Sequence, residues 1–374
     1  MARCLELAER YRGRTSPNPI VGCVIVDRAG KVIAEGAHAG PGTPHAEIAA
    51  LAKLKHKAKG ATLYVNLEPC THQGRTPPCA PVVRDSGVAR VVIGMEDPVP
   101  GHGGGTAVLK RAKVAVTSGV LREDCERANL PFVTWAREGR PAFTLKAAIT
   151  LDGKIATVAG ESQWITGEAA RADVMRLRTT HDAVMVGIGT VLADDPQLTA
   201  RVKGARDPIR IVLDGELRTP PMAKLLDPST SRTSPSAALA KLPRVIIVTG
   251  THAPTDREAA LIARGADVWC VPDDDKGQLD VTALARMLGE SGITSVLVEG
   301  GGEVHASLLD HQLADQLVLY VAPRIVGGPA KSWVGGAGLP VLASAHAFVF
   351  DDAVVRLGDD LRFTALARPV PEGT

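Results

Sequence analysis

The stretch ATLYVNLEPCTHQGRTPPCAPVVRDSG, residues 61–87, places an apolar segment, two cysteines and an amphipathic segment one after another. We expect a strand over 61–68 and a helix over 80–87, so that Cys70 follows the strand and Cys79 precedes the helix. A helix N-terminus lowers the pKa of a cysteine and favours the thiolate that binds metals. The stretch therefore predicts an α/β fold in which two thiolates stand between a strand and a helix.

A histidine and a glutamate lie upstream, at the start of a helical pattern over residues 45–55. Side chains two residues apart on a helix point about 200° apart. His45 and Glu47 can therefore contact the same small site only from the first turn of the helix, where side chains lean back past its N-terminus. Pro44, directly before them, is consistent with a helix start. One histidine and two cysteines make a three-ligand zinc site with an open fourth position. Zinc lowers the pKa of water in that position, and Glu47 can then take its proton and pass it to a leaving amine.

Zinc nucleobase deaminases carry the same His-x-Glu and Pro-Cys…Cys arrangement, although eight residues separate the cysteines here in place of the common two. Two other interpretations stay open. Cys70 and Cys79 could be ordinary buried cysteines, or His72 could be the fourth ligand of a closed structural zinc site. The second of these leaves Glu47 without a task, so the pattern favours catalytic deamination.

Composition argues against several classes of protein. The formal net charge of +2 argues against a nucleic-acid coat or a membrane-surface protein, and an aromatic content of 3% leaves few stacking platforms for bases. A zinc-stabilised RNA-binding module is therefore disfavoured. Six cysteines in 374 residues are too dilute for a secreted disulfide scaffold, and residues 1–14 lack an apolar signal core. No apolar run of about 18 residues is present. We expect a cytoplasmic protein that binds neither nucleic acid nor membrane.

Strand and helix patterns alternate along the whole chain, whose 374 residues exceed one average domain. We expect a hairpin over 21–36 in a first domain, residues 1–138, and at least five buried strands in a second domain, residues 142–370. The polar, proline-containing segment 137–141 is the expected junction. Residues 227–243, rich in Ser, Thr and Pro, are expected to form a long surface loop.

Several motifs, in the same order, resemble the family of bifunctional riboflavin-biosynthesis deaminase–reductases. In the first half they are GRTSPNPIVGCVIV (13–26), HAEIAAL (45–51) and EPCTHQGRTPPC (68–79). In the second half they are TLDGKIA (150–156), GESQWIT (160–166), TVLADDPQLTAR (190–201) and VEGGG (298–302). The resemblance implies a cytidine-deaminase-like αβα domain followed by a dihydrofolate-reductase-like α/β domain.

The substrate of this family is 2,5-diamino-6-ribosylamino-4(3H)-pyrimidinone 5′-phosphate. The resemblance implies zinc-dependent hydrolysis of its ring amino group, followed by reduction of the ribose to a ribityl chain with NADPH. The alternative is a deaminase of another nucleobase or nucleotide, whose C-terminal domain only binds or regulates. We expect a phosphorylated pyrimidine as the small-molecule partner, and a homo-oligomer.

For the deaminase domain, the resemblance implies zinc ligands at His45, Cys70 and Cys79 and a proton shuttle at Glu47. The implied candidates for contacts to the pyrimidine and the ribose phosphate are Asn18, His38, His72, Arg75 and Thr76. A phosphorylated substrate favours an arginine close to the pocket, which supports Arg75. One segment departs from the family: residues 95–109 carry Val99 and a GHGGG run where the family has an Asn and a Val-Ala-Gly-Arg-Gly-like run. The contacts of this loop therefore stay open.

The second half lacks a Gly-x-Gly-x-x-Gly fingerprint, which argues against an ordinary Rossmann domain. Gly300, Gly301 and Gly302 nevertheless separate a strand pattern from a helix pattern, and backbone NH groups at that helix start could hold a phosphate. A second strand pattern ends at Gly187 and Gly189. Such turns are more often purely structural, but two of them close together could cradle a dinucleotide.

The resemblance implies a cofactor site lined by Ala148, Trp164, Thr190, Asp194 and Gly301, and a substrate site lined by Ser162, Arg178, Leu198, Arg201 and Glu299. Hydride transfer to an imine-like carbon requires a cation or acid nearby, because charge develops on the nitrogen. Lys146 is our candidate, and a surface lysine on a strand edge is the alternative. Glu299 ends an apolar strand, where a buried carboxylate needs a partner. Substrate hydroxyls would serve as that partner.

Overall fold

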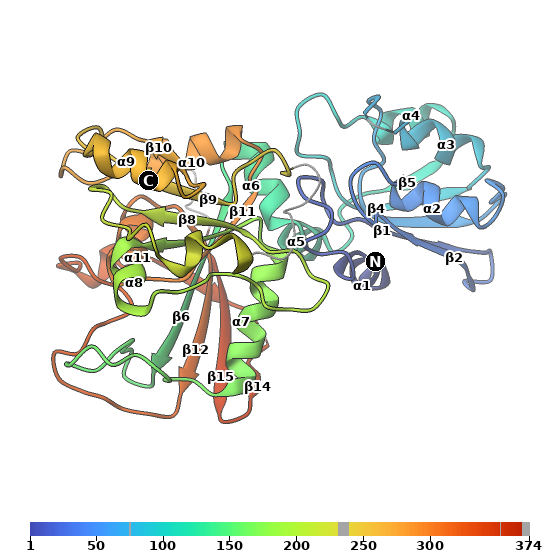
Figure 1. Cartoon of the computed structure of the whole chain (residues 1–374). Coiled ribbons are helices and arrows are strands. Elements are labelled where there is room, and N and C mark those ends of the chain that lie inside the picture. Colours follow the sequence, from blue (N-terminus) through green and yellow to red (C-terminus); the bar gives the residue numbers. More distant parts are fainter. Residues whose placement is uncertain (75, 231–238, 352, 369–374) are drawn as a thin grey trace. The chain divides into compact units, whose positions relative to one another are not determined.

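The computed structural model describes residues 1–74, 76–230, 239–351 and 353–368. The chain divides into two compact units, Met1–Gly139 and Arg140–Thr374, and each is described by itself (Figure 1). The division falls inside the polar segment 137–141. In the part of the chain that the structure describes, each helix is too short or too polar to span a bilayer.

The first unit is built on a five-stranded sheet. Its elements are α1 (Ala2–Glu9), β1 (Gly22–Val26), β2 (Val32–Ala37), α2 (Ala46–Ala52), β3 (Thr62–Leu67), α3 (Cys79–Asp85), β4 (Arg90–Met95), α4 (Gly105–Arg111), β5 (Ala115–Thr117), α5 (Arg122–Ala128) and α6 (Leu130–Glu138). The strand order is β2-β1-β3-β4-β5, with β1 antiparallel to β2 and β3, and with β3, β4 and β5 parallel. The predicted hairpin is confirmed, and so is the strand–helix unit, whose helix begins at Cys79 itself.

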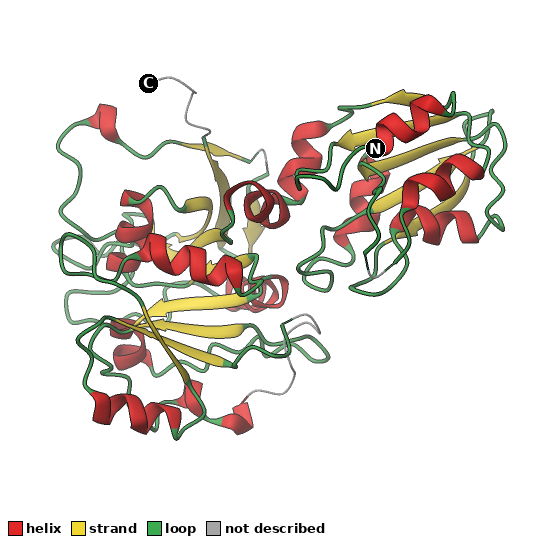
Figure 2. Cartoon of the chain, turned by 90° about the horizontal axis from the view of Figure 1, so that it is seen from above, coloured by secondary structure: helices red, strands yellow, loops and turns green. Residues whose placement is uncertain are grey.

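Successive side chains of each strand point to opposite faces of this sheet, and both faces carry apolar residues. Ile25 of β1 and Val65 of β3 pack in a core that also contains side chains of α2, α3 and α4. Val24 and Tyr64, one position away on the same strands, pack with α1. Because both faces of the sheet are covered, the unit has the predicted αβα layers, as Figure 2 shows.

Gly36 lets α2 lie directly on the hairpin. A Cβ atom at this position would lie 2.3 Å from the carbonyl oxygen of Ala46 and 2.5 Å from the backbone nitrogen of Ala50. Any side chain would therefore push the helix away from β2. The close approach fixes the start of α2, which carries His45 and Glu47, against the sheet.

The second unit is built on a larger, mixed sheet. Its elements are β6 (Ala142–Thr150), α7 (Glu168–Thr180), β7 (Ala183–Gly187), α8 (Ile188–Asp194), β8 (Ile209–Leu213), η1 (Lys224–Leu226), η2 (Pro228–Thr230), β9 (Val245–Thr249), α9 (Thr255–Ile262), β10 (Asp267–Cys270), α10 (Val281–Glu290), β11 (Ser295–Val298), α11 (Gly302–Asp310), β12 (Ala314–Ala322), η3 (Leu342–Ser344), β13 (Phe348–Phe350), β14 (Val355–Leu357) and β15 (Asp360–Ala367). The order is β10-β9-β8-β7-β11-β6-β12-β15-β13, and β14 pairs with β15. The strands from β10 to β12 in this order are parallel, whereas β15 is antiparallel to its neighbours.

The parallel strands of this sheet are short apolar runs, as expected where helices cover both faces. Every residue of β7, β8, β9 and β11 is buried, and most of β6 is too. The prediction of at least five buried strands is therefore confirmed. The predicted surface loop at 227–243 is described only in part, because residues 231–238 lie outside the described residues.

Candidate active sites

Three residues of the first unit bring soft metal-ligand atoms together. His45 is the N-cap of α2, Cys79 is the first residue of α3, and Cys70 follows β3. The Nδ1 atom of His45 lies 3.1 Å from Sγ of Cys79 and 3.6 Å from Sγ of Cys70. The ligand atoms of all three lie within 4.8 Å of one another. One imidazole nitrogen and two sulfurs fit zinc and leave a fourth position for water or substrate.

Glu47 lies in the first turn of α2 and is only 3% exposed. Burial raises the pKa of its carboxyl group to about 7. Within the sulfur pair, the hydrogen bond with Cys79 lowers the pKa of Cys70 to about 4 and raises that of Cys79. A carboxyl group with a pKa near neutrality can both accept and release a proton at pH 7, as a shuttle must.

Asn18 and His38 form a pair beside the metal-ligand cluster. The Nδ2 atom of Asn18 lies 3.1 Å from Nε2 of His38, and Nδ1 of His38 lies 3.3 Å from the carbonyl oxygen of Pro44. Nδ1 therefore donates to Pro44, and Nε2 accepts from the Asn18 amide. The His38 ring meets the His45 ring edge-on, with centroids 5.3 Å apart. Burial lowers the pKa of His38, which favours the neutral ring.

His72 stacks on His102, with ring centroids 3.8 Å apart. Its Nδ1 atom is buried and has no hydrogen-bond partner among the described residues. The hydroxyl of Thr71 donates to the carbonyl oxygen of Gly103 at 2.8 Å. This hydrogen bond joins the GHGGG loop to the segment between Cys70 and Cys79, which we call the cysteine insertion. The sequence does not predict a role for His102, because the GHGGG run matches no motif of the family and its contacts stay open. Arg75, the predicted phosphate-binding arginine, lies outside the described residues.

Two side chains of the cysteine insertion differ in their relation to the metal ligands. The hydroxyl oxygen of Thr76 lies 3.2 Å from Nε2 of His45. His72 is not part of the ligand cluster found among the described residues, which comprises His45, Cys70 and Cys79. The geometry therefore favours an open three-ligand site over a closed structural site.

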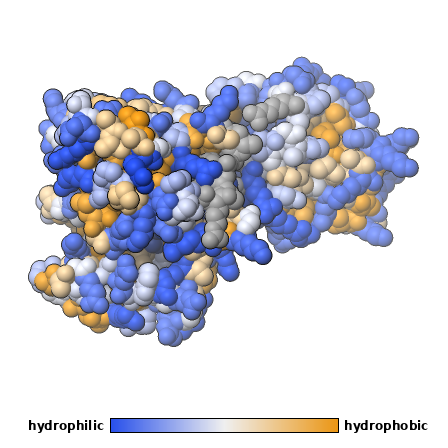
Figure 3. Space-filling model, in the orientation of Figure 1, coloured by the Kyte–Doolittle hydropathy of each residue, from blue (hydrophilic) through white to orange (hydrophobic). Residues whose placement is uncertain are grey.

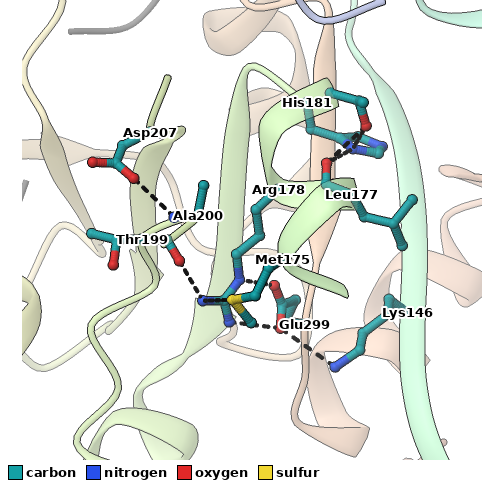
Figure 4. Close-up of polar contacts among 10 residues, drawn as sticks. Lys146, Met175, Leu177, Arg178, His181, Thr199, Ala200, Asp207 and Glu299 are labelled. Atoms are coloured by element: carbon teal, nitrogen blue, oxygen red, sulfur yellow. Dashed lines mark hydrogen bonds and ion pairs between the residues drawn. The ribbon is translucent and has the colours of Figure 1, made fainter. Parts of the chain in front are cut away.

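A charged network of the second unit centres on Glu299, which follows β11 (Figure 4). The Nη2 atom of Arg178, from α7, donates to Oε2 of Glu299 at 2.9 Å, and Nζ of Lys146, from β6, lies 3.4 Å from the same oxygen. Burial alone raises the pKa of Glu299, but the charges of Arg178 and Lys146 outweigh burial and lower that pKa to about 2. The buried carboxylate thus has partners within the protein, in addition to any substrate hydroxyl.

Lys146 is not a surface lysine on a strand edge. Strand β6 lies between β11 and β12 in the sheet, and the Lys146 side chain is 14% exposed. Its ammonium group lies in the interior of the charged network, beside Glu299. Ala148, two positions along the same strand, shares the face of the sheet on which Lys146 lies.

The loop after α8 brings two further predicted residues near this network. The Nη1 atom of Arg178 donates to the carbonyl oxygen of Thr199 at 2.9 Å. Leu198 and Arg201 flank Thr199 and Ala200, and both have a left-handed backbone conformation, with φ values of 57° and 54°. Burial and the charge of Arg178 lower the pKa of Arg201. The Leu198 side chain packs in the core, so its contact to a substrate would come from the backbone.

The two glycine turns of the second unit lie side by side, because β7 and β11 are neighbours. The backbone nitrogen of Gly187 donates to the carbonyl oxygen of Gly300 at 3.3 Å. A Cβ atom at Gly300 or Gly301 would meet the hydroxyl of Thr190 at 3.6 or 3.8 Å. The two predicted turns are therefore close together, and the N-terminus of α11 follows Gly301.

Trp164 and Ser162 lie on the segment before α7. The Ser162 hydroxyl donates to Oδ1 of Asp194 at 3.2 Å. The Trp164 side chain is 60% exposed, and the guanidinium of Arg171 lies 4.6 Å from its ring centroid. Arg324 donates to the Trp164 carbonyl oxygen at 3.0 Å. Neither arginine belongs to a quoted motif, so the sequence carried no signal for these contacts.

Comparison with known proteins identifies the family. Residues 1–95 match the family described as the cytidine and deoxycytidylate deaminase zinc-binding region, and residues 141–355 match the one described as the RibD C-terminal domain. The chain belongs to the RibD family. It is 42% identical to the riboflavin biosynthesis protein RibD of Actinobacillus pleuropneumoniae, over 92% of this chain and 89% of that protein. It is 38% identical to RibD of Bacillus amyloliquefaciens, over 100% of this chain and 97% of that protein.

A solved structure is similar over both units. It is the diaminohydroxyphosphoribosylaminopyrimidine deaminase/5-amino-6-(5-phosphoribosylamino)uracil reductase of Thermotoga maritima, with a TM-score of 0.82 and 35% identity. The similarity covers 98% of this chain and 97% of that one. The predicted family and fold class are therefore confirmed. As a RibD-family protein, the chain is a bifunctional deaminase and reductase of riboflavin biosynthesis that uses zinc and NADPH and acts on a small phosphorylated pyrimidine.

Proposed function

We propose that residues 1–138 hydrolyse the ring amino group of 2,5-diamino-6-ribosylamino-4(3H)-pyrimidinone 5′-phosphate, and that residues 142–370 then reduce its ribosyl group to ribityl with NADPH. One observation carries the first step: a buried carboxyl group, Glu47, interacts with Cys79 of the cluster of one nitrogen and two sulfur atoms. The second step rests on the Lys146–Glu299–Arg178 network, together with paired glycine turns in the same unit.

In the deaminase site, His45, Cys70 and Cys79 would hold zinc, which when bound acts as a Lewis acid and lowers the pKa of water. Glu47 takes the proton of the attacking water and passes it to the leaving amine. Burial suits Glu47 to this task, because it raises the pKa of the carboxyl group and excludes competing water. The remaining residues of the site bind and orient the pyrimidine.

Asn18 is proposed to donate to the pyrimidine, since an amide has two donors and His38 accepts only one of them. His38, His72, Arg75 and Thr76 are proposed to contact the ring and the ribose phosphate. The Nδ1 atom of His72, which has no partner in the part of the chain that the structure describes, supports its part in this assignment, because a buried polar atom without a partner is unfavourable until a ligand supplies one.

In the reductase site, NADPH supplies the hydride, and Lys146 is proposed to stabilise the charge that develops on the substrate nitrogen. Glu299 holds the Lys146 ammonium and the Arg178 guanidinium in place. The proposed substrate contacts are Ser162, Arg178, Leu198, Arg201 and Glu299. The proposed cofactor contacts are Ala148, Trp164, Thr190, Asp194 and Gly301.

We further propose a cytoplasmic homo-oligomer that binds neither nucleic acid nor membrane. Exposed apolar side chains between residues 339 and 354, among them Leu342 at 91% and Phe350 at 68% exposure, support an association surface. Figure 3 shows hydrophobic groups set among mostly hydrophilic residues on the face drawn. Light scattering of the purified chain tests the oligomer, and a monomer at micromolar concentration would contradict it.

Two assays on the full chain test the proposed function. Ammonia release from the diaminopyrimidine phosphate, without NADPH, measures deamination. Loss of NADPH absorbance with the deaminated pyrimidine measures reduction. We expect both, in that order, from one polypeptide. Ammonia release without NADPH oxidation at any substrate concentration would instead favour a C-terminal unit that only binds or regulates.

A further inference from the structure

Thr76 makes a contact that its place in the sequence does not indicate. Its hydroxyl oxygen lies 3.2 Å from Nε2 of His45, the ring nitrogen that does not contact the sulfurs. Nδ1 of the same ring lies 3.1 Å and 3.6 Å from the two sulfur atoms of Cys79 and Cys70. We propose that Thr76 is a positioning residue, which holds the His45 ring in the tautomer and orientation that a metal ion needs.

The chemistry of imidazole fixes the direction of this hydrogen bond. A neutral ring carries one NH group and one lone pair, on different nitrogens. Nδ1 of His45 must present its lone pair to the metal, since it is the nitrogen next to the sulfurs. The proton therefore belongs on Nε2, where the Thr76 hydroxyl accepts it. The hydrogen bond made by one ring nitrogen sets the state of the other.

The neighbouring histidine does not supply this acceptor. His38 lies edge-on to His45, but its own two nitrogens already contact the Asn18 amide and the Pro44 carbonyl. Among the described residues, Thr76 is the acceptor that Nε2 of His45 contacts.

The insertion between the two cysteines places the threonine hydroxyl. Its ends meet where the backbone nitrogen of Ala80 donates to the carbonyl oxygen of Cys70 at 3.1 Å. Within it, the backbone nitrogen of Gly74 donates to the carbonyl oxygen of Thr76 at 3.3 Å. The segment between the cysteines therefore supplies, through Thr76, an outer partner for the proposed histidine ligand.

This role is compatible with a contact to substrate. A hydroxyl has two acceptor lone pairs and one donor hydrogen, so accepting from His45 leaves the Thr76 hydrogen free to donate. The two roles differ in what they predict. An outer partner of a metal ligand changes metal affinity about 10- to 100-fold when it is removed, whereas a substrate contact changes KM and leaves metal affinity unaltered.

The test uses the full-length chain and zinc alone, with Thr76→Val to remove the hydroxyl at nearly constant volume and Thr76→Ser to retain it. Zinc affinity is measured by competition with a chromophoric chelator. We expect Thr76→Val to bind zinc about 10- to 100-fold more weakly than wild type, and Thr76→Ser to stay within about threefold. Wild-type affinity in Thr76→Val, or an equal loss in both variants, would overturn the proposal.

The inference rests on the proposed zinc ligands, so Cys79→Ser is measured alongside. Full zinc affinity in Cys79→Ser would overturn the ligand set as well, whereas full affinity in Thr76→Val alone overturns only the role of Thr76. Should Thr76→Val fail to fold, nitrogen-15 NMR of the zinc-loaded wild type decides the question. Zinc on Nδ1 leaves the proton on Nε2 with or without Thr76, so the readout is the hydrogen bond itself: a downfield-shifted Nε2 proton in slow exchange with solvent supports the proposal, and rapid exchange overturns it.

Discussion

Replacing Glu299 by glutamine tests whether the charged network of the second unit is built as the structure indicates. The substitution keeps the shape of the side chain but leaves Arg178 and Lys146 buried without a negative partner. The pKa of Glu299 is lowered from 4.5 to about 2 in the folded protein. A shift of that size corresponds to about 3 kcal/mol of stability, close to the cost of breaking a buried ion pair. We expect Glu299→Gln to lower the free energy of unfolding of this unit by about 3 kcal/mol at pH 7.

The pH dependence of this loss follows from the direction of the shift. Because the folded-state pKa lies below the unfolded value of 4.5, the stabilisation is complete well above pH 4.5 and disappears as the pH falls towards 2. The difference between wild type and Glu299→Gln should therefore be constant from pH 6 to 8. It should be smaller by about 1 kcal/mol at pH 4, where the unfolded carboxyl group is largely protonated.

Urea unfolding followed by tryptophan fluorescence measures this difference in a Trp135→Phe background, since Trp135 belongs to the first unit and Trp164, Trp269 and Trp333 belong to the second. Glu290→Gln is the matched control, because its exposed side chain should change stability by no more than about 0.5 kcal/mol. A loss for Glu299→Gln no larger than in this control would refute the reasoning. So would a loss at pH 4 that equals the loss at pH 7.

Three further predictions concern the deaminase site. Glu47→Gln should retain zinc but lower ammonia release by about 10²- to 10⁴-fold, while NADPH oxidation with the deaminated pyrimidine is unchanged; surviving deamination would contradict the proton shuttle. Removing zinc with a chelator should abolish ammonia release, leave NADPH oxidation intact and be reversed by added zinc; loss of both activities would argue against separate sites. His102→Ala should raise the KM for deamination about three- to tenfold, because the ring that stacks on His72 is lost. His102→Phe retains a ring and should leave the KM unchanged. Equal KM values in His102→Ala and wild type would rule out a role for the stack.

Much of the deaminase unit could be predicted because its signals are local. A short apolar run indicated β3, and the helical segment after Cys79 indicated α3, which begins one residue earlier than expected, at Cys79 itself. The side chains of His45 and Glu47 could act together only from a first helical turn, which is where the structure has both of them. Each of these inferences depends on a few neighbouring residues and on the geometry of one element.

Contacts between distant segments could not be predicted in this way. The stack of His72 on His102 joins two loops, and no periodicity in either loop specifies its partner. Lys146 and Glu299 are separated by 153 positions and meet because β6 and β11 are neighbours in the sheet. Strand order in a parallel sheet is set by how the crossover helices pack, which the sequence of a single strand does not encode.

The sequence by itself thus determined the α/β class, and it placed the residues of the proposed metal site after a strand and at the starts of two helices. These features depend on residue type and on local periodicity, which are read along the chain. Only the tertiary structure decided which nitrogen of His45 faces the sulfurs, that Thr76 lies on the other nitrogen, and that Glu299 is held between two cations. Those relations depend on ring orientation, burial and strand order, which arise only when the whole unit has packed.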